Sequence, residues 1–535
     1  MSAPTGRGTA VVVGAGIAGL AAARVLADRF AEVIVVDRDE LPDDAAPRRG
    51  VPQGWHSHVL LVAGQRALGD VFPGLHEALA ERGAVVFDSA ADLHLYRLGA
   101  AWQPVHTGLP FVSVSRPLLE HTMRRQVAQL PQVTIRAGAA VSGLIGADGQ
   151  VTGVVLDGAE HLAADLVVDA TGRGSRSDRW LSALGYPTPE VEEVKVSVGY
   201  VSRYYRHTPG DLPVQAAFVQ PTPPKEKRIG AALLVEDDRW LVSVGGWHGD
   251  YPPADEAAFL AHAESLPDPI IADLVRKAEP LTEPVPFQFP ANRRRLFEQL
   301  SDVPGGYLAI GDAVSSFNPL YGQGMTVAAQ QAKALGQVLD EHGPADADAV
   351  RDFYRRAAGI VTVPWQAAVG GDFDYPETGG QRPAAAALFG RYSTKVQLAA
   401  QISGEVRKVV LAVQHLLSPP TALWRPSLVA EVARASVHPE PGAVPEFGYG
   451  AHERPLWTAG DRDAERARAA LRAAGFTEFT DEQFGFAAES GEEGDPVLVA
   501  SLDGRAGDYR AALEAAGFAV TPDDTDPLLL SITAR

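Results

Sequence analysis

The chain has 535 residues, of which 46% are hydrophobic and 21% are charged, as in ordinary soluble globular proteins. Its formal net charge is -20, so the chain lacks the basic character that binding to nucleic acid or anionic lipid requires. Because the chain contains no cysteine, disulfides, thiolate catalysis and cysteine-ligated metals are excluded, and redox chemistry would need a bound cofactor.

The apolar stretch Ala10–Ala27 contains three glycines, which argues against a signal peptide. No other apolar run approaches the roughly 20 residues of a membrane span. We therefore expect a cytoplasmic protein without a membrane span.

The N-terminal pattern predicts two buried strands, residues 9–14 and 32–37, around an Ala- and Leu-rich helix at Ile17–Asp28. A polar loop, Arg38–His58, follows. The next predicted elements are helices at Val59–Leu68 and Pro117–Leu130 and strands at Val133–Arg136, Ala139–Ile145, Val151–Leu156 and Leu166–Asp169.

Between residues 191 and 290 the pattern changes to Val-, Tyr- and Trp-rich strands separated by Pro-rich turns, which predicts an inserted antiparallel sheet. A buried strand at Tyr307–Ile310 and a helix at Thr326–Leu339 return to the first pattern, and residues 346–436 are mostly helical. After a Pro- and Gly-rich linker, residues 470–482 resemble residues 512–524. This similarity indicates either an internal repeat or two similar helix C-caps in an Ala-rich chain.

The first motif that carries chemistry is Gly14-x-Gly16-x-x-Gly19, which follows a strand and opens a helix. Gly14 permits a tight turn, Gly16 lets the backbone approach a pyrophosphate, and Gly19 allows close packing of helix on strand. The helix N-terminus offers free N–H groups to phosphates. Asp37 ends the second strand, where its carboxylate can accept hydrogen bonds from ribose hydroxyls.

The second motif lies at residues 307–326, where a buried strand delivers Gly311 and Asp312. The Asp312 carboxylate is suited to a sugar-like hydroxyl. Pro319 and the segment Gly322-Gln323-Gly324-Met325 then lead into a helix, whose first N–H groups can face an electron-rich ring edge.

Both motifs, in this order and at this separation, resemble FAD-dependent monooxygenases of the para-hydroxybenzoate hydroxylase fold, over about residues 8–440. The resemblance implies that the N-terminal glycines hold the FAD pyrophosphate, Asp37 binds the adenosine ribose and Asp312 holds the ribityl chain. It also implies that Gly322 to Met325 lie against the pyrimidine edge of the flavin. Further cofactor contacts expected on this basis are Ile17, Ala18, Arg38, Gln53 and Val141.

The implied fold is α/β: a Rossmann-like FAD-binding core (three-layer ββα) with an inserted antiparallel-sheet substrate domain, a helical C-terminal part and a small extra α+β module. The expected domain bounds are 1–90, 113–190 and 291–345 for FAD binding, 91–112 and 191–290 for the substrate sheet, 346–440 for the helical region and 451–535 for the module.

A finer similarity is to squalene-epoxidase-like proteins and polyether epoxidases of the lasalocid and monensin type. It rests on Arg49-Gly50-Val51-Pro52-Gln53 with His56 and His58, on Phe72-Pro73-Gly74, and on the segments Val198–Arg206 and Asn318–Thr326. Arg48 and Arg49 either contact the cofactor or form a solvated basic loop. Arg116 resembles the arginine of this family that reaches FAD from the start of a helix. His56 and His58 lack an evident third metal ligand, so packing or contact with the flavin edge is the interpretation and no metal is expected.

One segment departs from the family. The hydroxylases usually have Ala-Asp-Gly where this chain has Ala170-Thr171-Gly172. The turn is still expected beside FAD. The missing aspartate puts self-contained reduction by NAD(P)H in doubt, so a separate flavin reductase becomes an alternative electron source.

The resemblance implies insertion of one oxygen from O2 through a C4a-hydroperoxyflavin, by epoxidation or hydroxylation of an apolar polyketide, terpenoid, indole or aromatic substrate. Catalysis would then rest on the flavin, and the sequence identifies no catalytic side chain and no oligomeric state. Candidate substrate-pocket residues are Tyr200, Phe218, Trp247, Phe287, Phe289 and Phe317, each of which can equally be core packing.

Three rival readings stay open. A flavin-dependent reductase of double bonds, similar to geranylgeranyl reductases, shares an Ala-Thr-Gly turn. Flavin-dependent halogenases carry a W-x-W-x-I-P signature and a catalytic lysine. This chain lacks the signature, and only seven of its 47 basic residues are Lys. A binding protein such as a GDP-dissociation inhibitor keeps the fold without FAD catalysis, and the intact second motif argues against it.

Overall fold

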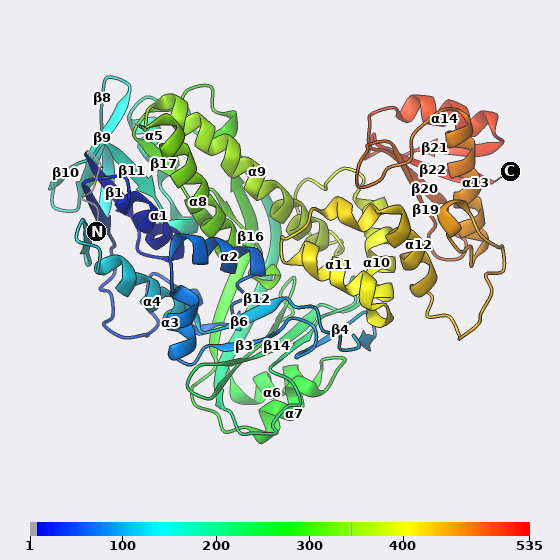
Figure 1. Cartoon of the computed structure of the whole chain (residues 1–535), viewed down its shortest axis with the longest axis horizontal. Coiled ribbons are helices and arrows are strands. Elements are labelled where there is room, and N and C mark those ends of the chain that lie inside the picture. Colours follow the sequence, from blue (N-terminus) through cyan, green and yellow to red (C-terminus); the bar gives the residue numbers. More distant parts are fainter. Residues whose placement is uncertain (1–7, 344, 535) are drawn as a thin grey trace. The chain divides into compact units, whose positions relative to one another are not determined.

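The computed structural model describes residues 8–343 and 345–534, which divide into two compact units (Figure 1). The first comprises the described residues up to His94, Gly108–Ala368 and Glu377–Gly380. The second comprises Leu95–Thr107, Val369–Pro376 and the described residues from Gln381 onward. The ends of the expected domains at residues 1–7, 344 and 535 lie outside the described residues, and the finer division remains a prediction.

The first unit is built on a five-stranded parallel sheet, as the sequence predicts. In spatial order its strands are β17 (Tyr307–Ala309), β11 (Leu166–Asp169), β1 (Thr9–Val13), β2 (Glu32–Val36) and β7 (Val133–Arg136). Val11 pairs with Ile34 on one side and with Val167 on the other. These strands are short apolar runs because a parallel sheet is buried on both faces. The Rossmann-like α/β fold is therefore present.

Helices cover this sheet and form the rest of the unit's hydrophobic core. They are α1 (Ile17–Ala27), α2 (Val62–Val71), α3 (Leu75–Glu81), α4 (Arg116–Ala128), α5 (Ser177–Ala183), α8 (Gly324–His342) and the start of α9 (Ala347–Asp372). Helices α6 (Glu256–Glu264) and α7 (Ile270–Lys277) pack on the inserted sheet described below. Helix α1 packs on β1, β2 and β11 and also contacts α8. Its small residues Ala21, Ala22 and Ala23 are fully buried, which permits this close approach.

A three-stranded antiparallel sheet adjoins β11 and consists of β8 (Val141–Ala147), β9 (Gln150–Leu156) and β10 (His161–Ala163). Strands β3 (Val85–Asp88) and β6 (Pro110–Ser113) form a separate antiparallel pair.

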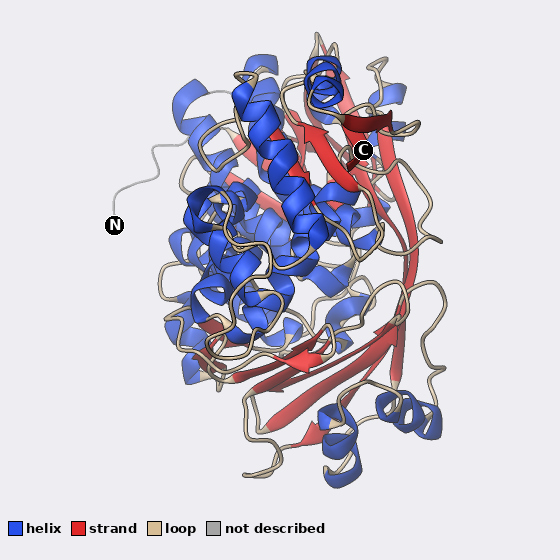
Figure 2. Ribbon diagram, turned by 90° about the vertical axis from the view of Figure 1, so that its right-hand side faces the viewer, coloured by secondary structure: helices blue, strands red, loops and turns tan. Residues whose placement is uncertain are grey.

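The expected inserted sheet is present and antiparallel. Within the first unit its order is β18 (Ser315–Ser316), β16 (Val285–Arg295), β12 (Val191–Arg206), β15 (Arg239–Gly246), β14 (Arg228–Val235) and β13 (Ala216–Val219). Figure 2 shows its long strands in red, with two short helices, α6 and α7, beside it. The pairing of β12 with β16 shifts register between Lys195 and Val198, at a bulge where Ser197 has φ of 44°.

The second unit contains β5 (Ala100–Ala101) and the part of β4 (Leu93–Arg97) from Leu95 onward, in which Tyr96 pairs with Ala101. Its helices are α10 (Ala386–Ile402), α11 (Gly404–Gln414), α12 (Pro426–Ala435), α13 (Ala459–Ala473) and α14 (Ala506–Ala515). Its four-stranded antiparallel sheet has the order β19 (Phe486–Glu489), β20 (Val497–Ser501), β22 (Leu529–Ala534) and β21 (Phe518–Pro522).

The C-terminal module consists of two halves with the same order of elements, α13–β19–β20 and α14–β21–β22. Each helix is followed by a glycine in the left-handed region, Gly475 with φ of 85° and Gly517 with φ of 90°. The sheet order places the two halves symmetrically, with β20 and β22 at the centre. This arrangement favours an internal repeat over two unrelated C-caps. Across residues 8–343 and 345–534, no helix is both long enough and apolar enough to cross a membrane.

Candidate flavin site

The first glycine-rich turn joins β1 to α1. Gly14 has φ of 108°, and a Cβ atom there would lie 2.6 Å from the carbonyl oxygen of Ala170. A Cβ on Gly19 would lie 1.8 Å from the carbonyl oxygen of Gly14. Protein packing alone therefore requires glycine at both positions.

Gly16 is different, because its φ is -80° and the nearest atom to an added Cβ is Nη2 of Arg48 at 4.0 Å. The protein leaves this space open. Gly16 is also the N-cap of α1, a helix with no side-chain cap and no acidic residue in its first turn. Open space beside uncapped N–H groups at the positive end of a helix suits a pyrophosphate. The neighbouring predicted contacts, Ile17 and Ala18, form the start of this helix.

Asp37 follows β2 and is bonded at both carboxylate oxygens. Its Oδ2 accepts a 2.7 Å hydrogen bond from the N–H of Ala15, and its Oδ1 accepts one of 2.9 Å from the N–H of Asp39. Nη1 of Arg48 lies 3.2 Å from Asp37 and 2.9 Å from Asp39, while its Nε donates to Glu120 at 2.7 Å. The carboxylate of Asp37 thus sits beside the Gly-rich turn, as ribose binding requires.

Arg48 and Arg49, the two arginines of the basic loop, have different environments, because only Arg48 takes part in this buried network. The Arg48 side chain is 7% exposed and bonded to three carboxylates, so the solvated-loop interpretation is wrong for it. Arg49 and the other predicted cation, Arg38, are exposed.

The second motif lies directly against the first. Gly311 has φ of 65°, and a Cβ there would lie 2.7 Å from the Cβ of Ala18, at the start of α1. Its N–H donates to Oε1 of Gln331 at 2.7 Å. A Cβ on Gly324, the first residue of α8, would lie 3.6 Å from Oδ1 of Asp312. The start of α8 and the Asp312 carboxylate therefore face each other.

The third motif meets the same carboxylate. Gly172 has φ of 75°, and its Cβ position lies 3.9 Å from the Cβ of Asp312. Three segments that are far apart in the sequence therefore meet at Gly311 and Asp312: the start of α1 touches Gly311, and the turn at Gly172 lies beside Asp312. Burial raises the pKa of Asp312, against the opposing effect of the cations Arg116 and Arg173.

Thr171, where the chain departs from the family pattern, contacts Asp169, a fully buried carboxylate at the end of β11. Its Oδ1 accepts from the N–H and the hydroxyl of Thr171 at 2.9 and 2.6 Å. Its Oδ2 accepts from the hydroxyls of Ser175, Ser177 and Tyr307 at 2.6, 2.8 and 3.2 Å. Thr171 therefore ties down the turn, and sequence reasoning missed this cluster.

Arg116, the arginine predicted to reach FAD, is the first residue of α4. Its Nη1 is 3.5 Å from Nε2 of His58, and its charge acts on Asp312. Its Nε is buried without a hydrogen-bond partner among the described residues. Burial and the positive charge of Arg116 lower the pKa of His58 to about 3, so this imidazole is neutral.

The segment expected at the flavin edge forms a tight turn. Asn318 caps it by accepting from the N–H of Leu320 at 3.2 Å, and Pro319 opens a short 3-10 turn. Gly322 has φ of 68° and lies against Val59. Oε1 of Gln323 and Oγ1 of Thr326 are buried and unpartnered in the part of the chain that the structure describes. These two atoms lie on either side of the predicted residues Gly324 and Met325, and Oγ1 of Thr326 faces Gly64 of α2.

His56 lies in an aromatic pocket that the sequence did not predict as a unit. The imidazole is fully buried, 4.9 Å from the ring of Tyr200 and 5.5 Å from that of Phe287. Gln53 hydrogen-bonds the hydroxyl of Tyr200. Two predicted substrate residues and two predicted cofactor contacts are therefore neighbours.

A chain of hydroxyl groups leads away from His56. Its Nδ1 lies 2.7 Å from Oγ of Ser202, which lies 2.6 Å from Oγ of Ser243, which lies 2.8 Å from Oγ of Ser57. Ser57 is half-buried, so the chain runs outward. The opposite atom, Nε2 of His56, is buried and has no partner within the described residues. Burial lowers the pKa of His56 to about 4.

The other predicted pocket residues are dispersed. Phe289 lies under the guanidinium of Arg173 at 4.7 Å, and Phe317 lies 6.4 Å from the ring of Trp365. Phe218 packs on an apolar cluster with Phe87 and Phe111, and Trp247 is buried after the end of β15. Val141 is buried in the core at the start of β8. Their roles toward substrate or cofactor remain predictions.

The residues present fit a flavin dinucleotide. The space at Gly16 and the uncapped start of α1 suit the pyrophosphate, and Asp37 and Asp312 suit hydroxyl groups. The buried Oε1 of Gln323, which has no hydrogen-bond partner among the described residues, lies in the segment where the flavin edge would be held.

Comparison with known proteins shows the family of this chain. The family model described as "FAD binding domain" matches residues 7–358. The chain belongs to this FAD-binding family. Its cofactor is accordingly FAD, as expected. Protein Rv3254 of Mycobacterium tuberculosis is 35% identical over 383 residues, which are 68% of this chain and 80% of that relative.

Solved structures share the fold of this FAD-binding chain at low identity. PqsL, described as "a probable FAD-dependent monooxygenase from Pseudomonas aeruginosa", has a TM-score of 0.51 at 17% identity and covers 68% of this chain and 99% of its own. The flavin-dependent brominase Bmp2 has a TM-score of 0.54 at 13% identity, over 76% and 92%. The 2-methyl-3-hydroxypyridine-5-carboxylic acid oxygenase has a TM-score of 0.51 at 18% identity, over 77% and 98%.

Proposed function

We propose that the protein is an FAD-dependent monooxygenase that inserts one oxygen atom from O2 into an apolar small molecule. The observation that carries this proposal is the position of Gly311 and Asp312, where the turns at Gly172 and Gly324 meet the open start of α1. The names of PqsL and of the pyridinecarboxylic acid oxygenase, which share the fold, support an oxygenase reaction. The finer class, epoxidation or hydroxylation of a polyketide, terpenoid, indole or other aromatic compound, belongs to the proposal.

Bound FAD supplies the redox and oxygen chemistry. The chain supplies binding and orientation. The N–H groups at the start of α1 bind the pyrophosphate, Asp37 and Asp312 accept hydrogen bonds from hydroxyl groups, and the cation Arg116 lies beside Asp312. The turn from Asn318 to Gly322 and the start of α8 hold the ring edge.

His56 is the side chain that we assign to the substrate end of the site. Its neutral imidazole packs against the rings of Tyr200 and Phe287, which also contact each other, and its Nε2 has no hydrogen-bond partner among the described residues. The chain through Ser202 and Ser243 fixes the ring and can move a proton between Nε2 and the half-buried Ser57. His56 thus binds a polar group of a substrate whose remaining surface is apolar.

The proposed electron source is a separate flavin reductase. The carboxylate that stands near the third motif, Asp169, is occupied by five hydrogen bonds and is fully buried. It is therefore not free to bind a nicotinamide cofactor, and Thr171 provides no charge in its place.

A halogenase is the second candidate, because the brominase Bmp2 shares the fold. A double-bond reductase is the third. The three reactions differ in the atom that enters the product: oxygen from O2, a halide, or hydrogen alone.

The decisive experiment is mass spectrometry of products made under labelled O2. The FAD-loaded protein is supplied with a flavin reductase, reduced nicotinamide cofactor, bromide and a panel of polyenes, phenols and indoles. We expect a product that carries one labelled oxygen atom, and none with the Asp312→Ala variant. A brominated or hydrogenated product without label would overturn the monooxygenase assignment.

A further inference from the structure

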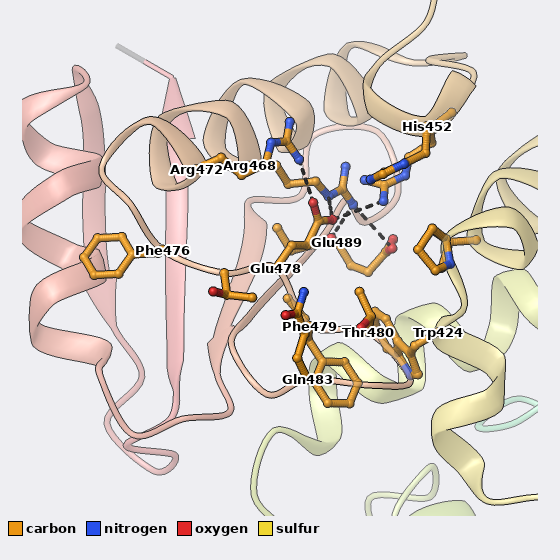
Figure 3. A pocket seen from close by; sticks show the side chains of 16 residues that line it. Trp424, His452, Arg468, Arg472, Phe476, Glu478, Phe479, Thr480, Gln483 and Glu489 are labelled. Carbon is orange, nitrogen blue, oxygen red and sulfur yellow. Dashed lines mark hydrogen bonds and ion pairs between the residues drawn. The ribbon is translucent and has the colours of Figure 1, made fainter.

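The second unit contains a cavity of about 260 Å³ that lies outside the residues matched by the FAD-binding family. It is bounded by α12, α13, the segment after α13 and β19. Figure 3 shows the arginines from and near α13 on one side and the rings of Trp424 and Phe479 on the other. Three arginines and two glutamates line it: Arg454, Arg468, Arg472, Glu478 and Glu489. The cavity thus has a cationic end and an aromatic end.

The three guanidinium groups differ in how well they are paired. Arg472 makes two close ion pairs, at 2.6 Å to Glu465 and 2.6 Å to Glu478. These carboxylates are the same ones that the two more deeply buried arginines contact. Arg472 is therefore well paired, and Arg454 and Arg468 make longer contacts to the same carboxylates.

Arg468 is 4% exposed, and its contacts to Glu465, Glu478 and Glu489 are 3.6, 3.4 and 3.6 Å long. Its hydrogen bond goes to the carbonyl oxygen of Ala488. Burial, followed by the positive charge of Arg454, lowers its pKa. A buried guanidinium with long ion pairs lacks a close anionic partner.

Arg454 has an unused donor. Its side chain is 9% exposed, its contacts to Glu465 and Glu478 are 3.4 and 3.1 Å, and its Nε is buried without a partner among the described residues. Unpaired buried donors of a cation are costly, so they are normally satisfied by a protein group or by a ligand.

The related second half of the module lacks most of this cluster. Aligned on Gly475 and Gly517, that half has Gly507, Arg510, Glu514 and Val520 where the first half has Glu465, Arg468, Arg472 and Glu478. It nevertheless forms the same helix–glycine–strand unit. The two carboxylates and Arg472 of the first half are therefore not required for this unit to form.

We propose that this cavity binds a small aromatic carboxylic acid, with its carboxylate on Arg454 and Arg468 and its ring against the wall that Trp424 and Phe479 form together. A guanidinium fork matches a carboxylate in geometry. The two glutamates at the cavity disfavour a doubly charged anion such as phosphate. The aromatic wall favours a flat apolar body. Such a site could take a regulator or a compound related to the substrate.

The test uses 2-naphthoate as the probe and 2-naphthamide as its uncharged analogue, titrated into the full-length FAD-loaded protein by calorimetry. We expect naphthoate to bind with 1:1 stoichiometry and naphthamide to bind at least ~10-fold more weakly, since a charged hydrogen bond is lost. Arg454→Gln should weaken naphthoate binding by about 10- to 100-fold. Arg466→Gln is the control, because Arg466 lies on α13, the helix that follows Arg454 and carries Arg468, is exposed and does not line the cavity.

A second variant guards against misfolding of Arg454→Gln. Gln483 is exposed and lines the cavity, so Gln483→Trp fills it without changing any charge. This variant should lose naphthoate binding and keep its full FAD absorbance. Equal binding of naphthamide, unchanged affinity in both cavity variants, or no binding of naphthoate at all would each overturn the proposal.

Discussion

The N–H of Ala15 donates a 2.7 Å hydrogen bond to Oδ2 of Asp37, and this bond ties the glycine-rich turn to the end of the neighbouring strand. The carboxylate thus shapes the turn as well as facing the expected ribose. Asp37→Ala should weaken FAD binding by about 10- to 100-fold, since hydrogen bonds to a charged group contribute about 1.5–3 kcal/mol. Fluorescence titration of the apoprotein with FAD measures this. Glu32→Gln, at the exposed other end of β2, should bind FAD normally.

Gly16 and Gly19 should respond differently to the same substitution. Gly16→Ala meets no protein atom closer than 4.0 Å, so the variant should fold with a normal melting temperature and lose FAD. Gly19→Ala places a methyl group 1.8 Å from a backbone oxygen, so the variant should be poorly soluble or strongly destabilised. Thermal melting and absorbance near 450 nm separate the two effects. Retention of FAD by Gly16→Ala would show that the pyrophosphate lies elsewhere.

Asp312→Ala should purify with little or no FAD, because the carboxylate beside which the turns at Gly172 and Gly324 lie is lost. The ratio of absorbance near 450 nm to that at 280 nm reports occupancy. Asp302→Ala, at an exposed aspartate outside the site, is the control. Full occupancy in Asp312→Ala would refute the assignment of this residue.

The buried His56 should make the protein sensitive to acid. Its pKa is about 4 in the folded state and near 6.5 when unfolded, so between these values the unfolded chain binds a proton that the folded chain does not. Folding stability is therefore lost as pH falls from about 6.5 toward 4. Between pH 7.5 and 5.0 this group accounts for about 2 kcal/mol. In urea titrations, His56→Gln should lose correspondingly less stability over that interval, and an unchanged loss would contradict the buried neutral state.

Restoring the family's aspartate should not restore the family's chemistry. Thr171→Asp would place a second carboxylate beside the buried Asp169 and remove a 2.6 Å hydrogen bond to it. We expect a loss of about 1–3 kcal/mol in the free energy of unfolding. Thr171→Ser keeps the hydroxyl and should melt near the parent temperature. A Thr171→Asp variant as stable as the parent would show that Asp169 tolerates the added charge.

The parallel sheet and the three glycine turns could be predicted because their signals are local. A short apolar strand, a glycine at a fixed offset and a helix follow one another within about twenty residues. Strand β16 was not predicted, because Pro286 and Pro290 interrupt its pattern and three arginines follow. It lies between β12 and the short β18, which leaves room for prolines.

Contacts between residues that are distant in the sequence could not be predicted from it. Ser202 and Ser243 read as ordinary strand residues, and only the pairing of β12 with β15 brings them together beside His56. The same holds for Arg454 and Arg468, whose shared carboxylates come from α13 and the segment after it. Side-chain chemistry that depends on register or on packing of remote segments becomes visible only in three dimensions.

The bulge at Ser197 determines which face of the sheet each later residue of β12 occupies. Alternate residues of a strand point to opposite faces, so one residue more or fewer before Val198 would invert the faces of the rest of the strand relative to its start. Tyr200 and Ser202 would then turn away from His56, although every residue of that group would still be present. Loss of a single residue at this point would inactivate the site without replacing any group that binds cofactor or substrate. The length of this segment is therefore itself a functional constraint on the gene.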